Sequence, residues 1–173
     1  MKGVIIICLK ELMTKNFGRE KWEAALEHSG LSKDTFFVAT EDVEEDKAMK
    51  IVESACKVLN ITLPQAADAF GEYWVCSYAA KIYKPYYQAA TSAKDFLLGM
   101  DNVHRITTES IPNARPPRFD YSWQDPKTLI MKYHSKRGLI DFLVGLAKGV
   151  GKYYRENLQV SKLSNESVKI VFP

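Results

Sequence analysis

Cysteine, histidine and long apolar runs are scarce in this sequence of 173 residues. Cys8, Cys56 and Cys76 are widely spaced, odd in number and outside any CxxC motif, which argues against a disulfide framework and against a zinc knuckle. The apolar run over residues 3–9 is too short for a membrane span and is not followed by a small-residue cleavage site. We therefore expect a reducing, cytoplasmic setting, without an export signal or a membrane anchor.

An excess of one charge sign is also missing. The 24 Lys and Arg residues nearly balance the 21 Asp and Glu residues, and they are spread along the chain, so nothing indicates a nucleic-acid partner. The sequence has no Walker loop, no nucleophile elbow and no metal-ligand spacing of the kind that enzymes use. We expect a ligand-binding domain with no catalytic residues, long enough to enclose a ligand in one core.

Apolar residues recur at helical spacing over most of the first 110 residues. Two pairs have the spacing of a capping box, Thr62 with Gln65 and Ser92 with Asp95. The acidic residues that follow Thr40 favour the positive end of a helix dipole. The pattern predicts helices over 3–17, from about 22 to 30, from just after 40 to 60, from 62 to a point before Pro85, and from 92 to 107.

The pattern changes after the three prolines of residues 112–117, which end the last of these helices. Residues 119–123 and 129–133 alternate as strands around a turn at Pro126, residues 138–156 return to helical spacing, and residues 158–163 and 168–172 form a second hairpin. This order predicts an α+β fold of one domain, residues 1–173: a mostly helical lobe (about 1–62), then an antiparallel sheet with an inserted helix (about 63–173).

His104 is the histidine that lies on an apolar helical face, together with Phe96, Leu97, Met100, Val103 and Thr107. A single histidine in such a place is more often a hydrogen-bonded core residue than a ligand. His28, beside a helix end, and His134, which alternates away from its neighbour on a strand, are expected at the surface.

Tyr133, Ser135 and Arg137 place three hydrogen-bond donors on one side of an extended chain. Such a row can hold carboxylates, and arginine adds a bidentate, charge-assisted pair. The alternative is a strand end in which the tyrosine packs, the serine caps the next helix and the arginine is solvated. Together with His104 and an aromatic interior, the three donors favour a pocket for a flat apolar macrocycle with an anionic edge, as heme is.

These residues resemble the heme nitric oxide/oxygen binding (H-NOX, HNOB) family, which is related to the sensor domain of soluble guanylate cyclase. The resemblance extends over nearly the whole chain. It rests on His104, on Pro116-Pro117-Arg118, on the Tyr133-x-Ser135-x-Arg137 motif, on Met1-Lys2-Gly3, on Gly71 and on Phe142-Leu143-x-Gly145-Leu146.

The resemblance implies heme b, buried between the two lobes, with His104 as its iron ligand. It implies that Tyr133, Ser135 and Arg137 hold the propionates and that Pro117 presses on the porphyrin. Each of the remaining positions is also consistent with ordinary core packing. We expect Met100 beside the heme and, on the distal side, Ile5, Leu9, Trp74, Val75, Tyr78, Phe142 and Leu146.

Phe142 departs from the oxygen-binding members of the family, which have a tyrosine there that donates to O₂. Phenylalanine has no donor, and NO and CO depend on one much less, so the sequence predicts an NO and CO sensor. The open alternatives are an O₂ sensor that uses Trp74 or Tyr78 as the donor and a heme-free interaction module.

The resemblance also implies how the signal leaves the domain. NO displaces His104 from the iron and the heme flattens against Pro117 and Ile5, which favours one of two packings of the domain. In bacteria, similar domains act on a histidine kinase, a cyclic-dinucleotide enzyme or a chemotaxis receptor, and we expect a signalling partner of this kind.

Overall fold

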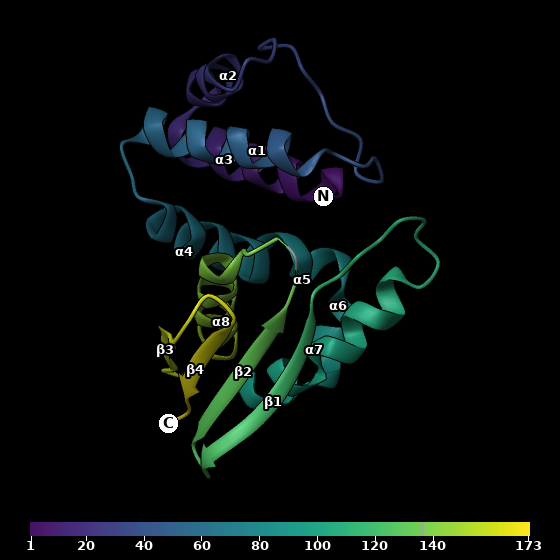
Figure 1. The fold of residues 1–173 in the computed structure, drawn as a ribbon, viewed down its shortest axis with the longest axis vertical. Helices are drawn as coiled ribbons and strands as arrows, with labels where there is room; N and C mark the ends of the chain where they lie inside the picture. The colour runs from purple at the N-terminus through teal and green to yellow at the C-terminus, as the bar shows by residue number, and fades with distance from the viewer. Residues whose placement is uncertain (136) are drawn as a thin grey trace. The chain divides into compact units, whose positions relative to one another are not determined.

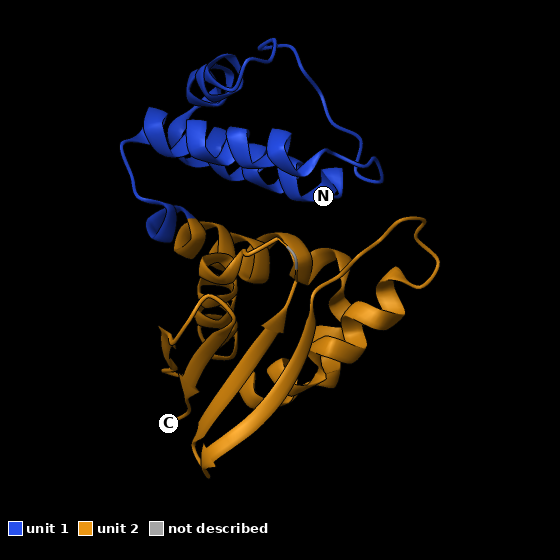
Figure 2. Cartoon of the chain, in the orientation of Figure 1, with its two compact units in different colours: residues 1–66 blue, residues 67–173 orange. Residues whose placement is uncertain are grey.

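The computed structural model describes residues 1–135 and 137–173. The chain divides into two compact units, residues 1–66 and 67–173 (Figure 2). Unit 1 is mainly helical, whereas unit 2 combines helices with a four-stranded antiparallel sheet (Figure 1). Within the described ranges, no helix is long and apolar enough to cross a membrane. The predicted α+β class, with helices first and an antiparallel sheet later, is confirmed.

Unit 1 contains α1 (Gly3–Phe17), α2 (Arg19–His28) and α3 (Glu45–Leu59). All three were expected from the apolar periodicity. Gly18 ends α1 with a positive φ of 90°, a conformation that glycine adopts without strain. The interior of this unit is built mainly from the apolar side chains Ile6, Cys8, Met13, Trp22, Leu26 and Ile51.

The predicted start of the third helix is wrong by a few residues. Only Glu45 and Asp46 lie in the first turn of α3. The preceding acidic residues bind the start of α1 instead: the carbonyl of Glu41 accepts a hydrogen bond from the Gly3 amide at 3.0 Å, and Asp42 pairs with Lys2 at 2.8 Å. These contacts, which are distant in sequence, keep the segment extended.

The predicted aromatic-rich helix consists of three segments, α4 (Leu63–Tyr73), a π-helix (Trp74–Tyr78) and α5 (Ala79–Ile82). Its capping box is confirmed, because the Thr62 amide donates to the Gln65 side chain at 2.8 Å. The expectation that this helix ends before Pro85 is confirmed, because α5 ends at Ile82 and a separate helix, α6 (Lys84–Ala89), follows. Pro85 lies in the first turn of α6, where its missing N–H removes no helical hydrogen bond.

The sheet consists of β1 (Arg118–Asp125), β2 (Thr128–His134), β3 (Gln159–Lys162) and β4 (Ser167–Val171), in the order β1-β2-β4-β3. Both predicted hairpins are present, and the pairing of Phe119 with Tyr133 and of Tyr121 with Met131 puts the alternating apolar residues on one face. Helices α7 (Ala93–Thr108) and α8 (Ile140–Tyr154) pack against the sheet.

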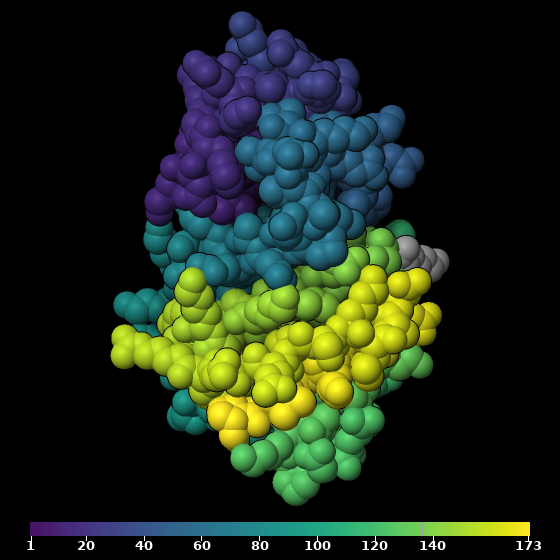
Figure 3. Space-filling model, turned by 90° about the vertical axis from the view of Figure 1, so that its left-hand side faces the viewer, coloured from purple at the N-terminus to yellow at the C-terminus, as the bar shows by residue number. Residues whose placement is uncertain are grey.

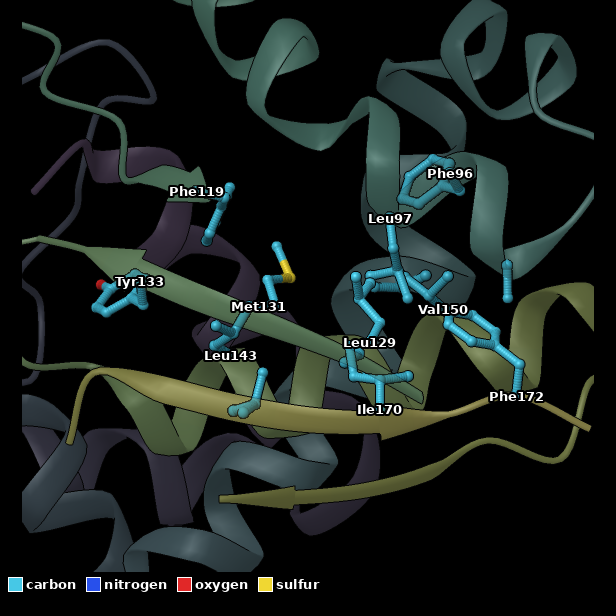
Figure 4. Packing of buried hydrophobic residues seen from close by; sticks show 14 of the residues in the cluster. Phe96, Leu97, Phe119, Leu129, Met131, Tyr133, Leu143, Val150, Ile170 and Phe172 are labelled. Carbon is cyan, nitrogen blue, oxygen red and sulfur yellow. The ribbon is translucent and has the colours of Figure 1, made fainter. Parts of the chain in front are cut away.

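The core of unit 2 lies between this sheet face and the helices. Leu97 of α7, Leu129 of β2, Val150 of α8 and Ile170 of β4 converge there (Figure 4). The C-terminal hairpin packs along α8 on the face seen in Figure 3. Because the strands and helices share one core, they fix the positions of α7 and β1 relative to each other.

Glycines let α4 and α8 approach to backbone contact. A Cβ added to Gly71 would lie 2.1 Å from the carbonyl carbon of Gly145, and one added to Gly145 would lie 2.1 Å from the carbonyl oxygen of Ala67. Backbone atoms cannot move aside as a flexible side chain can. The two glycines therefore set the distance between these helices.

We predict that Gly145→Ala lowers the free energy of unfolding by about 2 kcal/mol or more, because the methyl group pushes α8 away from α4. Gly99→Ala is the matched control, since a Cβ there meets nothing within 4 Å and alanine favours the helix. Urea unfolding of both variants checks the prediction. Equal stability of the two variants would contradict it.

Candidate functional site

His104 lies on α7, half-buried, and its ring is tied to the chain that follows the helix. The Nδ1 atom lies 3.3 Å from the carbonyl oxygen of Pro117. A carbonyl can only accept, so Nδ1 carries the proton and the lone pair is on Nε2. Nε2 makes no hydrogen bond to any residue that the structure describes. This is the tautomer and orientation that a metal-ligating histidine needs.

The surroundings of His104 keep its imidazole neutral. Desolvation by burial lowers the pKa of His104, and this effect exceeds the opposing influence of the Pro117 hydrogen bond and of the Asp101 carboxylate. A neutral imidazole is the form that binds a metal. The neutral ring can therefore bind a metal ion near neutral pH.

Asp101 and Arg118 belong to this region, although Asp101 was not among the predicted site residues. Asp101 lies one turn before His104 and accepts hydrogen bonds from Arg118 Nε at 2.7 Å and from the Phe119 amide at 3.0 Å. Hydrogen bonding from Arg118 is the main cause that lowers the pKa of Asp101 to about 2. A signal was available in the sequence, because Asp101 precedes His104 by three residues and Arg118 directly follows Pro117.

Phe119 connects His104 with Tyr133. The ring centroids lie 5.5 Å apart between His104 and Phe119 and 6.0 Å apart between Phe119 and Tyr133. The Tyr133 side chain is 7% exposed, and its hydroxyl makes no hydrogen bond to a residue that the structure describes. The structure thus brings the predicted iron ligand and a predicted propionate donor to one region of unit 2.

The extended row of donors that we expected after Tyr133 is only partly present. Strand β2 ends at His134, and the Arg137 amide donates to the Ser135 hydroxyl at 3.2 Å, which is a local turn. The expected extended row is therefore not continued beyond His134 in the described residues, and Lys136 lies outside them. Ser135 still has a hydroxyl proton to donate, because the turn uses its oxygen as the acceptor.

A second group of predicted site residues gathers around the π-helix and α8. Trp74 stacks on Tyr78 at 5.5 Å and on Phe70 at 5.9 Å, and the edge of Phe142 meets Phe70 at 5.6 Å. Phe70 was not predicted as a site residue, although its spacing of four from Trp74 could have indicated it. Three other predicted residues pack in or against the core of unit 2: Val75, Met100 and Leu146.

Ile5 and Leu9 are the predicted distal residues that belong to unit 1. Both lie on α1, where Leu9 is buried and Ile5 is half-buried. They share a helix and are four residues apart, so they occupy one face of it.

The side chains of unit 2 fit a heme. His104 offers a neutral imidazole with an available lone pair. Tyr133 has a hydroxyl without a partner in the described chain, and Ser135 has a proton to donate, as propionates require. Phe70, Trp74 and Phe142 supply aromatic surface for a flat macrocycle.

Comparisons with known proteins agree with this chemistry. The family model described as Haem-NO-binding matches residues 2–162. Among curated proteins, soluble guanylate cyclase gcy-32 of Caenorhabditis elegans is 25% identical over 157 residues, and gcy-35 of the same organism is 23% identical over 167 residues. These alignments cover 88% and 94% of this chain. The chain spans about a quarter of the length of these cyclases.

Solved structures share the fold. An oxygen-binding H-NOX domain related to soluble guanylate cyclases, in its oxygen complex, has a TM-score of 0.82 at 23% identity and covers 99% of this chain and 95% of its own. An H-NOX protein from S. oneidensis in the Fe(II)NO state has a TM-score of 0.85 at 19% identity and covers 100% and 98%. The chain therefore belongs to the Haem-NO-binding (H-NOX) family and is a heme b gas-sensor domain related to soluble guanylate cyclase.

Proposed function

We propose that residues 1–173 form one cytoplasmic sensor domain for NO and CO, with lobes at about 1–62 and 63–173. Bound heme would supply a ferrous iron that can bind the gas and one protein ligand. His104 is that protein ligand, and Tyr133, Ser135 and Arg137 hold the propionates. Pro117 presses on the macrocycle, and Met100 lies beside it. The distal side is formed by Ile5, Leu9, Trp74, Val75, Tyr78, Phe142 and Leu146.

The proposed preference among the gases rests on the lack of a hydrogen-bond donor at Phe142. Phe142 packs its edge on Phe70, so an aromatic ring without any polar atom stands where oxygen-binding members of the family have a tyrosine. Bound O₂ gains from a hydrogen bond more than NO or CO does, because it carries partial negative charge. The apolar edge therefore supports preference for NO and CO over O₂.

His104 connects gas binding at the heme with the packing of α7 against β1. When NO binds, His104 is released and α7 is free to shift relative to β1, so the domain moves between two packings. A partner that binds one packing better receives the signal. The proposed partners are a histidine kinase, a cyclic-dinucleotide enzyme, a chemotaxis receptor, or a cyclase module of the kind that the curated relatives carry.

The first test is the absorption spectrum of the reduced protein under argon, with NO, with CO and in air. We expect a Soret band that shifts with NO and CO but not with air. His104→Gly is expected to lose heme, or to keep it only when imidazole is added, because the cavity then accepts the free ligand.

His134→Gly is the matched control, since this histidine lies on the surface and pairs with Asp120. It should keep the spectra of the unchanged protein. A stable spectrum of an O₂ complex would contradict the preference for NO, and absence of a Soret band after heme supplementation would contradict heme binding itself.

We predict that Phe142→Tyr raises the affinity for O₂ by about fivefold, since a net hydrogen bond contributes about 1 kcal/mol. The affinity for CO should change less than threefold. Titration of the reduced variant with each gas measures both. Equal changes for O₂ and CO would indicate altered packing against Phe70 instead of a new donor.

An O₂ sensor is the second candidate, and one observation favours it. The indole Nε1 of Trp74 makes no hydrogen bond to a described residue, so it is available as a donor. If Trp74 donates a hydrogen bond to O₂, Trp74→Phe will weaken O₂ binding about fivefold and leave CO binding nearly unchanged. We expect no O₂ complex in either protein under the first proposal.

A further inference from the structure

The first half of α7 is fixed at several points. Ser92 caps the helix by accepting the Asp95 amide at 3.0 Å, and the Glu156 carboxylate accepts the Ala93 amide at 2.8 Å. Phe96 and Leu97 are buried in the core of unit 2. This half of the helix moves only if core contacts break.

The second half of α7, from Gly99 to Thr108, is held less firmly. None of its residues is fully buried, and a Cβ at Gly99 would meet nothing within 4 Å. Glycine in the interior of a helix costs about 1 kcal/mol relative to alanine and eases bending. The helix can therefore bend at Gly99 while its first half stays in the core.

Asp101 ties this second half to β1. Its carboxylate accepts two hydrogen bonds from the Arg118 guanidinium, at 2.7 and 2.5 Å, and a third from the Phe119 amide at 3.0 Å. The Tyr121 hydroxyl of β1 accepts a hydrogen bond from the Asp101 amide at 3.4 Å and donates to the Leu97 carbonyl, in the first half of the helix, at 2.9 Å. Of these contacts, only the Arg118 pair is open to solvent, with 53% of the Arg118 side chain exposed.

We propose that Asp101 and Arg118 are positioning residues that hold the second half of α7 against β1 and thereby limit the movement of His104. His104 lies one turn beyond Asp101 on the same helix, and its ring is tied to Pro117, the residue before Arg118. The pair and the imidazole are thus attached to the same two segments. For its effect on the gas signal, this inference rests on the proposed function.

The pair suits a reversible restraint. A planar guanidinium matches the two carboxylate oxygens and fixes their direction, which a lysine cannot do. Because the ion pair is largely exposed, it is modest in strength and can open without unfolding the core. Release of His104 then has to overcome this pair, the Pro117 bond and the bonds of Asp101 to Phe119 and Tyr121 at this end of α7.

Hydrogen exchange tests the restraint without heme. Arg118→Gln and Asp101→Asn should raise amide exchange of residues 100–108 about twofold to fivefold, as loss of a partly exposed pair implies, and should leave residues 93–98 unchanged. Amide exchange in the double variant should be no faster than in either single variant, because both substitutions remove the same ion pair. The exchange rate of residues 100–108 in Arg118→Lys should lie between the rates of the single variants and that of the unchanged protein.

The second measurement uses the heme-loaded, reduced protein. Resonance Raman of the iron–histidine stretch should shift in Arg118→Gln, and the ratio of NO complex in which His104 has left the iron to NO complex in which it has not should rise about twofold to fivefold. Asp68→Asn is the matched control. It breaks an exposed ion pair between α4 and α8, Asp68 with Lys148 at 2.6 Å, and should change neither signal.

Unchanged exchange of residues 100–108 in both single variants would overturn the proposal. Faster exchange with an unchanged iron–histidine stretch would also overturn it, because the pair would then hold the helix without positioning His104. A protein that binds no heme would refute the proposed function alone, and the exchange experiment would still decide whether the pair restrains α7.

Discussion

The hydrogen bond from His104 to the carbonyl of Pro117 is the constraint on which the site depends. It fixes which ring nitrogen has the lone pair, and it joins α7 to the chain that enters β1. Burial of the ring keeps it neutral. Any movement of the imidazole must therefore also strain the contacts of α7 with β1, and this is how an event at one ring can reach the sheet.

The other side of unit 2 depends on a backbone contact. Gly71 and Gly145 bring α4 and α8 so close that no side chain fits between them. The π-helix follows directly on α4, and its Trp74 stacks between Phe70 and Tyr78. Two glycines thus fix the helices that carry the aromatic residues, so the shape of the aromatic group follows from helix packing more than from the aromatic residues themselves.

Much of the fold and the position of His104 on a helix could be predicted from the sequence. The capping pair at Ser92 and the alternation of residues 119–133 are local patterns, and local patterns report helices and strands well. The predictions that were wrong have another cause. Glu41 lies outside α3 because it binds Gly3, and β2 ends at His134 because Ser135 closes a turn. Both depend on contacts that no periodicity contains.

The sequence by itself determined the α+β class, the helix that carries His104 and the motif of Tyr133, because periodicity, caps and spacing are local. Only the tertiary structure decided which nitrogen of His104 is free and that Asp101 holds Arg118 across two elements. These are facts about distances between segments 13 and 17 residues apart. Such distances are set when helices and strands pack into a common core, since packing chooses one arrangement among the many that the same local pattern allows.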